Sequence, residues 1–166
     1  MTEAPSRDRS YPSLLDRLAD DDPSRATEGR EARSVRLQKL RGNVLRDLDR
    51  LFNATQSSDD HVLGDELLSG SVINYGLPGL AGRPASQVDL TELARMLREV
   101  IVRFEPRILA HTLKVSAERT RDGWHNVLAF RIEGQVWSQP VPLEIVLRTE
   151  IDLESGSTHV VDSMGG

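Results

Sequence analysis

Hydrophobic side chains recur at three- and four-residue steps in two stretches of the chain, a spacing that predicts two amphipathic helices. The first stretch covers residues 34–53, where the repeating positions are Leu37, Leu40, Val44, Leu48 and Leu51. The second covers residues 89–104, where Asp89 is a capping residue and Glu92 follows three positions later, as in a capping box. Its apolar face comprises Leu90, Leu93, Ala94, Leu97, Val100, Ile101 and Phe104. Pro106 ends this helix, because its ring fixes φ and disfavours helical geometry in the residue before it.

After Pro106 the hydrophobic period changes from about 3.6 to about 2, which predicts antiparallel strands. The alternation covers residues 113–118 and 128–132, a long stretch at 143–153, and a brief return at 158–161. One face of the long stretch carries Leu143, Ile145, Leu147, Thr149, Ile151 and Leu153. Because the helices precede the strands, the expected fold class is α+β: an antiparallel β-meander with the two main helices packed on one face.

Two prolines beside the long strand bear on its place in the sheet. Pro140 and Pro142 flank Val141, and such prolines belong on an edge, at a bulge or at a crossing. If the strand at 143–153 lies at an edge, its free N–H and C=O groups would accept an added strand from another protein. The sheet is therefore a candidate docking site for a strand of another protein.

The chain is expected to divide into an extended N-terminal arm at residues 1–33 and a single α+β domain at residues 34–162. The arm is rich in charges and prolines, and one apolar stripe in it predicts a short helix near 13–19 that needs a partner surface. The stripe consists of Leu14, Leu15 and Leu18. An arm that folds back onto its own domain explains the stripe equally well. Residues 54–88 form a connector, in which apolar side chains at 71–82 anchor a series of glycine turns.

The amino-acid composition excludes several classes of function. The chain of 166 residues has no cysteine, which excludes thiolate catalysis, disulfides and cysteine-type zinc sites. Its formal charge of −5 argues against nucleic-acid binding, and the one basic stretch, at 34–53, is typical of a solvated helix face. No apolar run approaches the roughly 18 residues of a membrane helix, and the N-terminus lacks the apolar core of a secretory signal. We therefore expect a cytoplasmic protein without direct membrane insertion.

Catalytic chemistry finds little support in the sequence. No two histidines have the four-residue spacing of a helical metal pair; they are His61, His111, His125 and His159. No G-x-S-x-G motif marks a nucleophilic serine. Glu150 and Asp152 share the polar face of a strand, whereas the general acid of a glycosidase needs an apolar pocket that raises its pKa. We expect no catalytic residue, no metal and no cofactor.

Core packing does not account for Glu105-Pro106-Arg107, a rigid tripeptide that follows the second helix. One interpretation is a helix stop with a local ion pair, which contributes little at a surface. The alternative is that Arg107 forms a preorganised fork for a partner's carboxylate, with Glu105 as a matching acceptor.

Five ordered blocks of the sequence resemble the TssE family, the type VI secretion baseplate components within the wedge-protein family of phage contractile tails. Besides the basic stretch at 34–53, the blocks are SLLDRL at 13–18, SVINYGLP at 71–78, RFEPR at 103–107 and NVLAFRIEGQVWSQPVPLEIVLRTEIDLESG at 126–156. The tripeptide Glu105-Pro106-Arg107 matches the signature of that family and is intact.

The resemblance implies a structural role. Members of the family lie in the baseplate wedge, where the Glu-Pro-Arg region is implicated in wedge contacts, and they connect the inner-membrane-anchored baseplate to the first ring of the contractile sheath. Their sheet resembles the interlocking domain of the sheath protein and can accept strands from sheath subunits. The expected partner-binding residues are Glu105, Pro106, Arg107, Leu143, Ile145, Leu147, Arg148, Leu14, Leu15 and Leu18.

Two other functional classes stay open. One is a peptidoglycan-cleaving, lysozyme-like enzyme, because some relatives carry that label. The other is a soluble regulator that shares the fold but binds a different partner.

Overall fold

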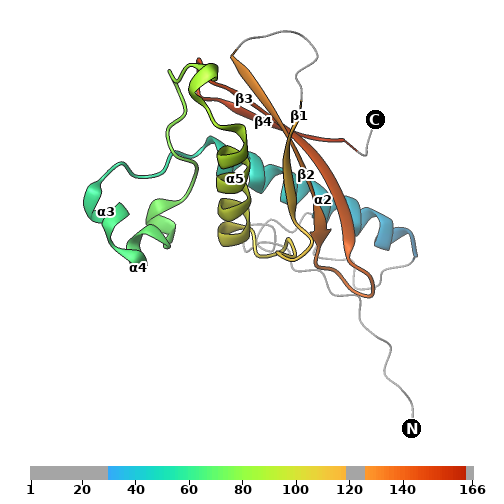
Figure 1. Ribbon diagram of the computed structural model, residues 1–166. Coiled ribbons are helices and arrows are strands. Elements are labelled where there is room, and N and C mark those ends of the chain that lie inside the picture. The colour runs from blue at the N-terminus through green and yellow to red at the C-terminus, as the bar shows by residue number, and fades with distance from the viewer. Residues whose placement is uncertain (1–29, 119–125, 164–166) are drawn as a thin grey trace.

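A computed structural model describes residues 30–118 and 126–163 (Figure 1). The helical elements are α2 (Arg30–Asn53), α3 (Asp60–Gly64), α4 (Glu66–Ser69), the 3-10 turns η1 (Val72–Asn74) and η2 (Ala85–Gln87), and α5 (Leu90–Phe104). The strands are β1 (Lys114–Glu118), β2 (Val127–Val136), β3 (Leu143–Asp152) and β4 (Thr158–Asp162). The arm leucines Leu14, Leu15 and Leu18 lie outside the described residues, as does His125.

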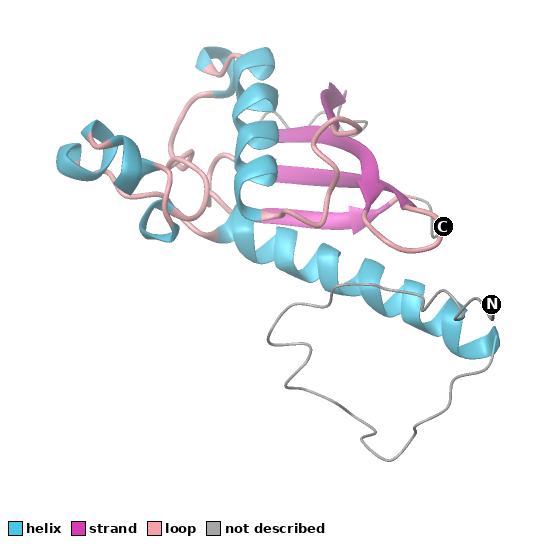
Figure 2. Ribbon diagram, turned by 90° about the horizontal axis from the view of Figure 1, so that it is seen from below, coloured by secondary structure: helices cyan, strands magenta, loops and turns pink. Residues whose placement is uncertain are grey.

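The four strands form one antiparallel sheet in the order β1-β2-β3-β4, so each strand pairs with its neighbour in the sequence. Helix α5 packs against β1, and α2 packs against β4. Both helices cover the same face of the sheet, with α5 crossing the strands and α2 running along them (Figure 2). The expected α+β meander with two main helices on one face is confirmed.

The core lies between the sheet and the two helices, and its residues follow the predicted periods. Burial alternates along β3, where Ile145, Leu147 and Ile151 are buried and their neighbours are not. These side chains join Leu48 of α2 and Leu97 of α5, both fully buried, in one hydrophobic cluster. The alternation arises because the opposite face of the antiparallel sheet is left to solvent.

The long strand β3 lies inside the sheet, because β2 pairs along its whole length and β4 pairs with its second half. The last pair between β3 and β4 joins Leu147 to Asp162, and the N–H of Ser163, just after β4, still donates to the Val146 carbonyl (2.9 Å). Only residues 143–145 of β3 therefore extend past these contacts. Pro140 and Pro142 lie in the connection from β2 to β3, where no ladder hydrogen bond is required of them. An edge position for this strand is therefore wrong over most of its length.

Hydrogen bonds fix the C-terminal end of α2 and the N-terminal end of α5. Helix α2 begins at Arg30, four residues before the expected start, and ends at Asn53. The Asn53 amide donates to the Thr158 carbonyl (2.8 Å) and accepts from the Thr158 N–H (2.9 Å), so it pairs with β4 as a strand residue would. At the start of α5, the Asp89 side chain accepts from two backbone N–H groups of the first turn, which confirms the predicted cap.

Part of the connector packs against the core, as predicted, and Gly76 allows a close backbone contact there. The Leu77 N–H donates to the Ala54 carbonyl (2.9 Å), and the Leu77 carbonyl accepts from the Gln56 N–H (2.8 Å). Gly76 has a φ of 121°, and a Cβ atom at this position would lie 2.2 Å from the Ala54 carbonyl oxygen. Only glycine adopts this conformation without strain, and Leu77 and Leu80 beyond it are buried.

Candidate functional site

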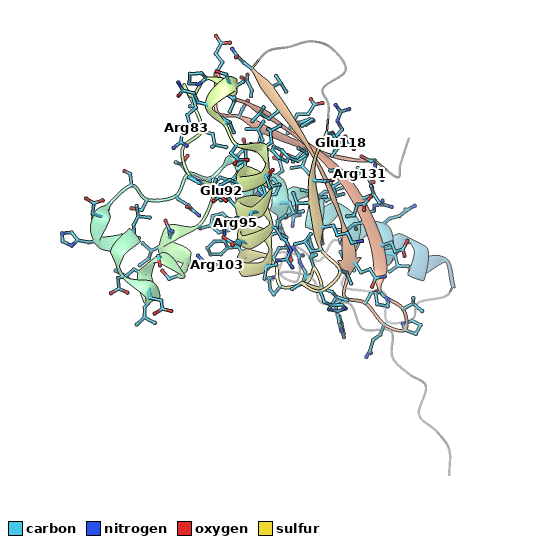
Figure 3. All side chains as sticks on the ribbon, viewed as in Figure 1. Arg83, Glu92, Arg95, Arg103, Glu118 and Arg131 are labelled. Carbon is cyan, nitrogen blue, oxygen red and sulfur yellow. The ribbon has the colours of Figure 1, made fainter. Side chains whose placement is uncertain are left out.

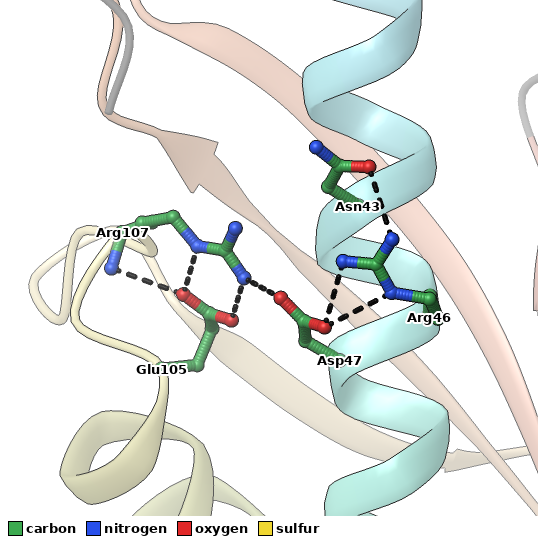
Figure 4. Close-up of polar contacts among 5 residues, drawn as sticks. All are labelled: Asn43, Arg46, Asp47, Glu105 and Arg107. Carbon is green, nitrogen blue, oxygen red and sulfur yellow. Dashed lines mark hydrogen bonds and ion pairs between the residues drawn. The ribbon is translucent and has the colours of Figure 1, made fainter. Parts of the chain in front are cut away.

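The turn after α5 brings Glu105 and Arg107 into a bidentate ion pair (Figure 4). Arg107 donates through Nε to Glu105 Oε1 (2.7 Å) and through Nη2 to Glu105 Oε2 (2.5 Å), and its backbone N–H also reaches Oε1 (3.2 Å). Pro106 between them is exposed. The side chains of Glu105 and Arg107 are only 5% and 13% exposed, so this is a buried pair rather than a surface one.

A third residue, Asp47, joins this pair from α2 (Figure 4). Arg107 Nη2 also donates to Asp47 Oδ2 (2.6 Å), although the two residues are 60 positions apart. The other oxygen of Asp47 accepts from Arg46 through Nε (3.3 Å) and Nη2 (3.1 Å). We call Asp47, Glu105 and Arg107 the triad. It links the end of α5 to α2.

The triad keeps a positive charge under the surface of the domain. Burial alone would lower the pKa of Arg107, but the hydrogen bonds and charges of Glu105 and Asp47 outweigh it and raise that pKa above its ordinary value. The third guanidinium nitrogen, Nη1, is buried and has no hydrogen-bond partner among the described residues. Burial also raises the pKa of Tyr75, and the charges of Asp47 and Glu105 raise it further. The Tyr75 ring packs edge-on against Phe104, with 5.2 Å between ring centroids.

This geometry makes the triad an internal cross-link. Of the two interpretations of the tripeptide it favours the local ion pair, in a buried form that also holds two helices together. The fork of Arg107 is filled by carboxylates of its own chain, and Pro106 is the exposed member of the tripeptide. Asp47 was not singled out from the sequence, because no local spacing connects it with the turn after α5.

The other predicted partner-binding residues of the described chain lie on β3, where the structure separates them by face. The apolar ones are on the core side, with Ile145 and Leu147 at 1% and 0% exposure: Leu143, Ile145 and Leu147. Arg148 lies on the opposite, solvent-facing side, where it approaches Glu118 of β1 (3.6 Å). Glu118 also approaches Arg131 of β2 (3.7 Å; Figure 3). This face therefore carries opposite charges in sequence across three strands.

Strand β4 forms one edge of the sheet, and α2 occupies part of that edge. The Ser163 N–H donates to β3, and in an antiparallel pair only every second residue bonds to the same neighbouring strand. Thr158 and Asp162 therefore turn their backbone N–H and C=O groups away from β3. The groups of Thr158 are taken by the Asn53 amide. The Asp162 side chain is held by Arg41 of α2 (2.5 Å).

Strand β1 forms the other edge of the sheet, and no described residue pairs as a strand with its outward backbone groups. Gln135 of β2 accepts from the Leu109 N–H (2.8 Å), so alternate residues of β2 turn their backbone groups towards β1. In this register Ser116 bonds to β2, while Val115 and Ala117 turn their N–H and C=O groups away from it. No strand of the described residues pairs with that side of β1.

The described part of the chain holds no cluster of three or more residues that could ligate a metal ion. Three of the histidines are exposed there: His61, His111 and His159. At the end of β3, hydrogen bonds from the Glu154 N–H and the Ser155 hydroxyl lower the pKa of Asp152, the opposite of what a general acid requires. None of the helices in the described ranges is both long and apolar enough to cross a membrane.

Comparison with protein-family models matches residues 38–141 to the family described as baseplate wedge protein gp25. The matched segment runs from α2 through the triad and β2 into the connection that follows, and it stops before β3. No curated protein and no solved structure matches the chain.

Proposed function

The chain belongs to the family of baseplate wedge protein gp25, and we propose that it is a type VI secretion subunit that links the baseplate wedge to the contractile sheath. Members of this family are structural components of contractile-tail baseplates, where they meet other baseplate components. In the proposed role the protein lies at the cytoplasmic side of an inner-membrane-anchored baseplate and helps to start sheath polymerisation.

The observation that supports the sheath link is the open backbone of β1. An extended segment of a sheath subunit would pair with the outward groups of Val115 and Ala117 as an added strand. Strand β1 suits this pairing better than β4, because Asn53 and Arg41 of α2 already engage β4. The core-facing residues of β3 would support this sheet from within: Ile145 and Leu147, which are buried, and Leu143, which is partly buried.

Contacts with other wedge subunits are assigned to the turn that the triad holds in place. Pro106 is exposed there, while Glu105 and Arg107 are fixed beneath it by ion pairs. The turn therefore offers a rigid surface whose position depends on α2. Arg148 on the solvent-facing side of the sheet and the arm leucines are the further proposed contacts: Leu14, Leu15 and Leu18.

Replacing Ala117 with proline tests the sheath link. The Ala117 N–H points away from β2, so Ala117→Pro leaves the β1–β2 ladder intact but removes a donor that an added strand needs. Ala117→Ser keeps the N–H at the same exposed position and is the matched control. With fluorescently labelled sheath in cells, we expect Ala117→Pro to join the wedge but start no sheath, and Ala117→Ser to behave as wild type. Normal sheath formation with a folded Ala117→Pro protein would contradict strand addition at β1.

A further inference from the structure

Residues 59–74, which we call the finger, project from the domain beside α5 and comprise α3, α4 and η1 (Figure 1). The described residues contain eight exposed large hydrophobic side chains, and four of them lie in the finger. They are Leu63, Leu67, Val72 and Ile73, with exposures of 50%, 84%, 79% and 61%. Neither α3 nor α4 has a buried residue, so these side chains do not serve the core of the domain. Such a concentration marks an interaction surface.

Polar contacts, rather than the apolar side chains, attach the finger to the domain. The buried Asn74 side chain accepts from the Ser57 N–H (3.1 Å) and donates to the Ser69 carbonyl (3.1 Å). Arg103, on the side of α5 that faces the finger, donates to the same Ser69 carbonyl (3.0 Å; Figure 3). The finger is thus held in one position while its apolar side chains remain available.

The finger is also acidic. Residues 54–74 contain four carboxylates and no lysine or arginine: Asp59, Asp60, Asp65 and Glu66. Asp59 and Asp65 cap α3 and α4, which leaves Asp60 and Glu66 without a capping role. Exposed apolar side chains beside negative charge are complementary to a helix with one apolar and one basic face.

We propose that the finger is a docking site for a basic amphipathic helix of a partner protein. A second copy of this chain does not supply such a helix from its described residues, because the apolar stripe of its basic helix α2 is buried in its own core at Leu40, Val44, Leu48 and Leu51. The site uses none of the residues assigned above to wedge or sheath contacts. Its test is therefore independent of the proposed function.

Binding of designed peptides to the full chain tests the proposal. The probe is a fluorescent peptide of about 18 residues, long enough to form a helix, with Leu on one face and Lys on the other, and the comparator has Glu at every Lys position. We expect the Lys peptide to bind at least about tenfold more tightly, as measured by fluorescence anisotropy. The double variant Leu67→Ser/Ile73→Ser should lose about tenfold or more of that affinity, since both side chains would be truncated at the interface.

Two variants separate apolar docking from general charge attraction. Val141→Ser removes a side chain of similar exposure (65%), in the connection between β2 and β3, and should bind the Lys peptide as wild type does. Asp60→Asn/Glu66→Gln keeps both caps and should weaken binding up to about fivefold for each charge removed. Equal binding of the two peptides overturns the proposal, as does unchanged binding by the Leu67→Ser/Ile73→Ser variant. If sedimentation shows that wild type forms dimers and that the Leu67→Ser/Ile73→Ser variant does not, the finger is assigned to a second copy of the chain instead.

Discussion

Replacing Arg107 with alanine should destabilise the domain by about 3 kcal/mol, because it removes the cation between two carboxylates. Breaking a buried ion pair by deleting one partner typically costs about 3–5 kcal/mol. The lower end applies here, since Asp47 is 22% exposed and keeps its contact with Arg46. Glu105 also keeps its hydrogen bond from the backbone N–H of residue 107, which alanine retains.

Urea unfolding followed by tryptophan fluorescence measures this loss. A change of about 3 kcal/mol moves the midpoint down by about 1–3 M urea for a domain of this size. Arg95→Ala is the matched control, because Arg95 also pairs with two glutamates, Glu92 and Glu99, but its side chain is 54% exposed. That variant should lose less than about 1 kcal/mol. Equal losses for Arg107→Ala and Arg95→Ala would refute the assignment of the triad as a buried cross-link.

Two further predictions concern the surroundings of the triad. Gly76→Ala should lower the free energy of unfolding by about 2 kcal/mol or more, because its Cβ would meet the Ala54 carbonyl oxygen at 2.2 Å in a backbone conformation with φ of 121°. Gly42→Ala, where a Cβ meets nothing within 4 Å, should raise it by up to about 1 kcal/mol in the same urea titration. Because the folded protein raises the pKa of Tyr75 above 10.0, the stability from its neutral form is present below that pH and lost as pH rises through the folded pKa. Across this pH range the free energy of unfolding should decline less for Tyr75→Phe than for wild type. An identical decline in the two proteins would contradict the raised pKa.

The two main helices, the strands and the direction of their buried faces were predictable, because each follows from a local period. The Asp89 cap and the inward face of β3 are examples, confirmed by hydrogen bonds and burial. The place of β3 in the sheet was not predictable from the sequence. An antiparallel strand with one solvent-facing side alternates apolar and polar residues in the same way at an edge or inside the sheet. Asp47 was equally hidden, because its partner Arg107 lies 60 positions away and only packing of α5 against the body of the domain brings the two together.

The internal position of Arg107 changes how a loss of assembly should be interpreted. Arg107→Ala would weaken wedge contacts indirectly, by loosening the turn that presents Pro106, even if no partner touched the guanidinium. Leu48→Ala, at a fully buried position of α2, should lower stability by a similar 3 kcal/mol or so without altering the tripeptide. If the turn positions a docking surface, Arg107→Ala should reduce recovery of wedge subunits on co-purification more than Leu48→Ala does. Equal recovery would mean that the triad acts through stability alone and would remove Glu105, Pro106 and Arg107 from the proposed contact surface.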